Sequence, residues 1–208
     1  MIGNLARAFA AGVIVLTLGL SSAMAQPGAR SGNPVPPVPA DLEVGAGYSL
    51  FFKAHAIGTQ DYVCLPSASG VAWKQIAPQA TLYESFRGFS QQVATHFLSP
   101  NVDESGLLRP TWQHSFDSSR VWARVVQPST DANYVEAGAI PWLLLAVVGD
   151  AAGPMGGDFL TRAKKIQRLN TSGGVAPATG CTQSTDLGAL ALVPYTADYF
   201  FYRAWPPQ

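Results

Sequence analysis

The sequence predicts an all-β fold, a single-domain antiparallel β-sandwich or barrel held by one disulfide. About ten short apolar segments are separated by turns rich in Gly and Pro, which number 20 and 16 among the 208 residues. No long amphipathic helix accompanies them, and the connections are too short for the crossover helices that parallel strands need. Charged residues make up only 12% of the chain, which argues against disorder.

The N-terminal 25 residues are expected to be a signal peptide. Arg7 precedes the apolar run 8–20, and the small residues Ala23 and Ala25 precede the expected cleavage point. The alternative is a membrane anchor, but the run is shorter than the roughly 20 residues that a spanning helix needs. We therefore predict an exported protein, periplasmic or extracellular, with no membrane span in the mature chain.

Two further regions follow the signal peptide. Residues 26–40 are rich in Pro and Gly and predict a solvated, polyproline-like tether, with an SH3-type ligand as the alternative. Residues 41–208 have the length of one domain and are long enough to bury a core of their own.

Apolar alternation and turn residues place the strands of this domain. Residues 140–148 are apolar throughout and fit a buried strand or a short buried helix, and residues 159–169 alternate imperfectly, so that a helix is an alternative there as well. The expected strands are 48–56, 59–65, 71–76, 91–98, 111–116, 121–127, 140–148, 159–169, 187–193 and 195–202.

The two cysteines, Cys64 and Cys181, are expected to form a disulfide, because an exported chain meets an oxidising compartment. Two buried free thiols, or a bond between chains, are the alternatives. An intramolecular bond would bring residues 58–64 beside the segment that ends at Cys181.

Composition and motifs exclude several function classes. Thirteen basic residues balance thirteen acidic ones, which leaves no surplus to neutralise nucleic-acid phosphates or an anionic membrane surface. The chain has no G-x-S-x-G elbow, no phosphate-binding glycine loop and no His-Glu-x-x-His motif. The three histidines, His55, His96 and His114, do not stand at metal-ligand spacing. We predict no cofactor and no metal.

Candidate binding residues come from three segments of unusual composition. If the disulfide forms, polar residues before Cys64 and before Cys181 would meet in one patch, although they could equally satisfy the backbone of a long ordered loop. His96 and Trp112 come from the remaining segment, which combines residues 96–100 and 110–114. The full candidate set is Gln60, Tyr62, His96, Trp112, Gln167, Arg168 and Asn170.

Motifs spread along the chain resemble one known family. They are Ala54-x-x-x-Gly58-x-Gln60-x-Tyr62-x-Cys64, Trp73 with Ala77-Pro78, His96-Phe97, Pro110-Thr111-Trp112, and the segments 140–145, 166–177 and 193–202. In this arrangement the chain is similar to the family catalogued as domain of unknown function 3455, exported proteins of bacteria and fungi. The resemblance implies no activity. The Asp-Gly-Ser turn usual after Trp112 is replaced by Asp117-Ser118-Ser119.

Three function hypotheses follow. The first is a non-catalytic binding or structural module for a small molecule, a glycan or an envelope partner, favoured by the many aromatic residues. The second is a hydrolase or metal-assisted enzyme using His96. A catalytic histidine needs a polar partner within about 2.6–3.2 Å and a cleft beside it, so a buried His96 with only backbone partners would remove this hypothesis. The third is a stress or surface-coat protein.

Overall fold

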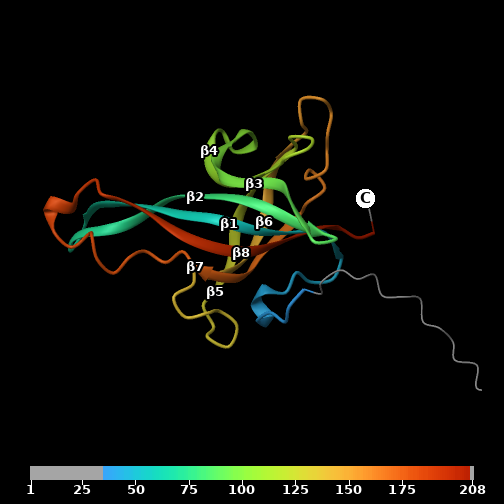
Figure 1. The fold of residues 1–208 in the computed structure, drawn as a ribbon. Coiled ribbons are helices and arrows are strands. Elements are labelled where there is room, and N and C mark those ends of the chain that lie inside the picture. The colour runs from blue at the N-terminus through green and yellow to red at the C-terminus, as the bar shows by residue number, and fades with distance from the viewer. Residues whose placement is uncertain (1–34, 207–208) are drawn as a thin grey trace, which may run out of the picture. The chain divides into compact units, whose positions relative to one another are not determined.

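The domain is a closed antiparallel barrel of eight strands (Figure 1). The computed structural model describes residues 35–206. The strands are β1 (Tyr48–Ser67), β2 (Gly70–Phe86), β3 (Phe89–Asn101), β4 (Leu107–His114), β5 (Arg120–Ser129), β6 (Trp142–Ala151), β7 (Lys165–Gly173) and β8 (Leu190–Ala204). Each strand pairs with the next, and β8 returns to pair with β1. The barrel confirms the all-β prediction.

Alternate residues of each strand point to opposite faces of the sheet, one toward the barrel interior and the other outward. Along β8, the alternate residues Tyr195, Ala197, Tyr199 and Phe201 are buried in the barrel interior. Phe200 between them faces outward, yet it is also buried. A second apolar cluster on the outer face covers it.

The outer cluster lies beneath the segment that leads into the barrel. The short 3₁₀ helix η1 (Ala40–Leu42) places Leu42 against Phe200, and Val35 and Val38 pack against the same cluster. Residues 35–39, which the sequence assigns to a solvated tether, are therefore packed on the barrel, because their valines have apolar surface to bury. Ala40, the last residue of the predicted tether, is the first residue of η1. The predicted signal peptide and residues 26–34 of the tether lie outside the described residues.

Several predicted strands are joined in the structure. Segments 71–76 and 187–193 were expected to end near Pro78 and Pro194, but β2 and β8 run on through these prolines. Each proline is paired on one side only: Pro78 with Gln60 and Pro194 with Thr59, both on β1. A proline without a ladder hydrogen bond is tolerated where the other side of the strand is unpaired.

Two smaller corrections concern β1 and β7. The segments 48–56 and 59–65 form one strand, β1, which passes through Gly58 without a break. The strand expected at 159–169 begins only at Lys165, and residues 159–162 form a turn in which Leu160 is buried.

The barrel opens at one end because strand pairing stops early there. The last β2–β3 pair toward this end is Ala80 with His96, and β4 and β5 pair over only three positions, the last being Thr111 with Trp122. Beyond these pairs β2 separates from β3, and β4 from β5. This separation gives solvent access to the interior.

The predicted disulfide between Cys64 and Cys181 is present, with Cα atoms 5.5 Å apart. It ties the end of β1 to the connection between β7 and β8. In the described part of the chain, no helix is long and apolar enough to cross a membrane.

Candidate functional site

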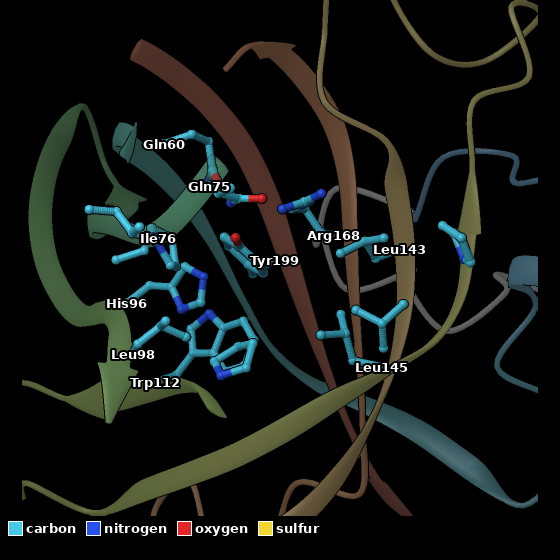
Figure 2. Close-up of a pocket in the computed structure, with 15 residues that line it drawn as sticks. Gln60, Gln75, Ile76, His96, Leu98, Trp112, Leu143, Leu145, Arg168 and Tyr199 are labelled. Atoms are coloured by element: carbon cyan, nitrogen blue, oxygen red, sulfur yellow. The ribbon is translucent and has the colours of Figure 1, made fainter. Parts of the chain in front are cut away.

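A cavity of about 450 Å³ lies inside the open end of the barrel (Figure 2). All eight strands contribute to its walls, so it is an interior space of the barrel and not a groove between loops. Its polar lining residues are Gln60, Gln75, His96, Arg168 and Tyr199, and its apolar ones are Ile76, Ala77, Pro78, Leu98, Pro110, Trp112, Val125, Pro128, Leu143 and Leu145.

The mouth of the cavity lies where the strands separate. Ile76 and Val125, on the separated parts of β2 and β5, are exposed to solvent. Trp112, Leu145 and Tyr199 are almost fully buried and form the deep wall. Figure 2 shows Trp112 across the space from Leu145. A molecule entering where β2 separates from β3, or β4 from β5, would therefore meet aromatic and aliphatic surface.

Arg168 supplies a positive charge in this apolar surrounding. Its side chain is oriented by Pro141, whose carbonyl oxygen accepts hydrogen bonds from Nε at 3.2 Å and from Nη2 at 2.8 Å. The residue is only 9% exposed. Within residues 35–206 it forms no ion pair with a carboxylate. Buried charges are normally paired, so an unpaired one is exceptional.

Two further donors near the cavity lack partners within the described chain. Gln60 accepts a hydrogen bond from Gln75 through Oε1, but its amide nitrogen is buried without an acceptor. The indole nitrogen of Trp112 is also buried without an acceptor. A buried donor without a partner costs about 1–3 kcal/mol, so both nitrogens favour an acceptor placed beside them.

His96 is held neutral beside the cavity. Its Nδ1 lies 2.9 Å from the carbonyl oxygen of Thr111, so Nδ1 carries the proton and donates it. The ring stacks on Trp112 with centroids 4.2 Å apart. Burial lowers the pKa of His96 to about 3, and the hydrogen bond to Thr111 opposes that shift only partly. At neutral pH, Nε2 is therefore a hydrogen-bond acceptor.

This geometry does not meet the condition set for a catalytic His96. Its hydrogen-bond partner in the described chain is a backbone carbonyl, with no carboxylate to orient the ring. No group of three residues capable of binding a metal was found among residues 35–206. A neutral His96 that is hydrogen-bonded to a backbone carbonyl therefore does not support the hydrolase hypothesis.

Tyr199, which lines the cavity, lies beside a second buried tyrosine, Tyr195. The hydroxyl groups of Tyr195 and Tyr199 lie 3.4 Å apart. Burial raises the pKa of both side chains, and the charge of Arg168 reduces the shift without cancelling it. Both hydroxyls therefore stay protonated at physiological pH, so Arg168 has no phenolate partner here.

Four of the seven sequence-predicted candidates line this cavity: Gln60, His96, Trp112 and Arg168. The other three lie elsewhere. Tyr62 donates through its hydroxyl to the carbonyl of Gly174 at 2.7 Å. Gln167 faces the outer cluster, where its amide donates to Leu42 and accepts from Tyr202. Asn170 is exposed and donates to Asp198. Gln167 and Arg168 cannot share a face because adjacent strand residues point to opposite sides.

Tyr199, Leu143 and Leu145 belong to the cavity although the sequence did not single them out. The alternation along 195–201 is a signal for Tyr199, because it places that side chain on the same face as Tyr195 and Phe201. The segment 140–148 carries no comparable signal. It is apolar at every position, so its inward face is visible only in the folded barrel.

Comparison with known proteins gives one match. Residues 45–203 match the model of a family described as "Protein of unknown function (DUF3455)". No curated protein and no solved structure matches the chain. The matched range includes all the residues that line the cavity.

Proposed function

The chain belongs to the DUF3455 family of proteins of unknown function, and we propose that it is a non-catalytic module that binds a small organic molecule inside its barrel. The observation that carries the proposal is the cavity itself: an open space of about 450 Å³ that contains a buried arginine with no carboxylate partner among residues 35–206. A core selected only for stability would fill such a space and would leave out the charge.

The size and lining of the cavity fit this role. Small-molecule sites typically measure about 300–1,000 Å³ and combine apolar walls with a few polar groups that fix orientation. Eight-stranded barrels are wide enough to hold one small ligand. An interior space entered at the open end of the barrel favours a small molecule over the glycan or envelope partner that the composition also allowed.

The place of action belongs to the same proposal. The signal-peptide pattern of residues 1–25 and the single disulfide support an exported protein that meets its ligand in the periplasm or outside the cell. Uptake, storage or transfer of the ligand would each require only a reversible binding site.

The proposal can be tested with a neutral apolar probe, N-phenyl-1-naphthylamine, whose fluorescence rises in apolar surroundings. We expect saturable binding of one probe per chain and a higher unfolding midpoint at saturation. Leu98→Trp should fill the cavity and weaken binding at least about tenfold. Leu108→Trp is the matched control, because Leu108 is exposed on β4 outside the cavity. Absence of saturable binding, or binding unaffected by Leu98→Trp, would reject the proposal.

A further inference from the structure

We propose that the ligand is an organic monoanion, a carboxylate with a compact apolar body, and that its carboxylate binds Arg168. This inference rests on the proposed function and specifies the chemical class of the ligand.

Arg168 is both accessible to a ligand and prevented from moving away. Of the five N–H groups of a guanidinium, one on Nε and one on Nη2 are used by the carbonyl of Pro141. Arg168 also interacts with the hydroxyl of Tyr199, and within residues 35–206 its remaining N–H groups have no other hydrogen-bond partner. Arg168 lines the cavity, and Figure 2 shows its guanidinium facing the space beside Gln60 and Gln75. The end of the guanidinium that carries Nη1 and Nη2 therefore matches the two oxygens of a carboxylate.

The charge of the cavity sets the charge of the ligand. Arg168 is the only charged residue among those that line it, since the neighbouring polar groups are neutral amides, hydroxyls and the uncharged His96. A single negative charge would neutralise the guanidinium. A doubly charged phosphate would leave one negative charge unpaired in an apolar space, at a considerable desolvation cost. The cavity therefore favours a carboxylate over a phosphate.

The rest of the lining defines the body of the ligand. Leu143 and Leu145 form one wall, and Leu98 and Trp112 face them across the space (Figure 2). These side chains suit a flat ring or a short aliphatic chain and provide few partners for a sugar. A hydroxyl group on the ligand could still be accepted, by Nε2 of His96.

The experiment compares acids with their amides. Binding of 2-naphthoate and 2-naphthamide, which share one ring system, is measured at pH 7 by titration calorimetry, with octanoate and octanamide as an aliphatic pair. We expect each acid to bind about 10- to 100-fold more tightly than its amide, the range for hydrogen bonds to a charged group. We expect 2-naphthyl phosphate to bind more weakly than 2-naphthoate.

A variant assigns the preference to Arg168. Arg168→Gln keeps a donor for the Pro141 carbonyl and removes the charge, so the ratio between acid and amide should fall to about one. Arg162→Gln is the matched control: Arg162 is exposed outside the cavity, and its Nε also donates to a backbone carbonyl, that of Phe159. It should keep the full preference. If Arg168→Gln does not fold, the ratio of acid binding to amide binding by the natural chain tests the carboxylate proposal by itself.

The outcomes separate this inference from the proposed function. Equal binding of acids and amides, or an acid preference that survives Arg168→Gln, would overturn the carboxylate anchor and leave small-molecule binding standing. Tightest binding of the phosphate would overturn the monoanion assignment. Failure of every probe, including neutral N-phenyl-1-naphthylamine, would overturn both.

Discussion

Replacing both cysteines by alanine should weaken the protein without unfolding the barrel. Cys64 lies at the end of β1, and Cys181 lies in the connection 174–189 between β7 and β8. In the folded protein this connection is also held by hydrogen bonds between the backbone of Cys64 and that of Gly188 and Ala189, at 3.0 and 2.9 Å. The barrel itself closes through the extensive pairing of β1 with β8. The bond therefore anchors a loop on a sheet that forms without it.

The size of the effect follows from the sequence separation of 117 residues. The loop-entropy relation gives an upper value of about 4–5 kcal/mol for a loop of this length, and measured disulfide contributions are typically about 2–4 kcal/mol. In a domain of this size each kcal/mol lowers the midpoint by roughly 2–4 °C. We therefore expect the midpoint of Cys64→Ala/Cys181→Ala to fall by about 5–15 °C.

Thermal unfolding followed by far-ultraviolet circular dichroism measures this shift, and hydrogen exchange locates it. Amides of residues 174–189 should exchange faster in the variant, whereas those of β3 and β4 should be unchanged well below the midpoint. The natural protein treated with a reductant is the control and should behave like the variant. A midpoint that moves by less than about 2 °C, or faster exchange throughout the barrel under native conditions, would refute the reasoning.

Three further predictions concern the turn after β4 and a close approach between β1 and β2. Asp117 accepts hydrogen bonds from Phe159, Ser119 and His114; burial raises its pKa, but these bonds outweigh burial and hold the pKa below its ordinary value. The stabilisation by the ionised Asp117 carboxylate is thus present above the unfolded-state pKa of about 4 and is lost as the pH falls from there toward the lower folded-state pKa. Asp117→Asn should therefore lower the unfolding free energy by about 2–4 kcal/mol at pH 7, measured by urea unfolding. A cost that persists unchanged at pH 2 would contradict this. Ser118 has a left-handed φ of 60°, so Ser118→Gly should raise the unfolding free energy by about 0.5–1 kcal/mol, and a loss of stability would disprove the strain. A Cβ at Gly58 would overlap the backbone of β2, so Gly58→Ala should destabilise by at least about 1–3 kcal/mol, and unchanged urea unfolding would show that the strands can move apart.

Alternation and turn chemistry were sufficient to predict most of the strands, because one face of each strand must reach the core. They failed at Pro78 and Pro194, where the predicted breaks do not occur. Whether a proline interrupts a strand depends on whether its other edge is paired. That is a property of the barrel's register and cannot be read from the residues beside the proline.

The candidate site likewise has features that the sequence predicts and features that depend on the register of the barrel. Composition, alternation and spacing predict the β class, the cysteine pair and a set of candidates that includes Gln60, His96, Trp112 and Arg168. That these four meet inside the barrel, while Gln167 faces the outer cluster and Asn170 lies at the surface, becomes visible only in the folded barrel. The reason is that a strand residue's face follows from register and from closure of the sheet. Both are set by pairings between residues far apart in the sequence, such as Tyr48 with Ala204, which are 204 − 48 = 156 residues apart.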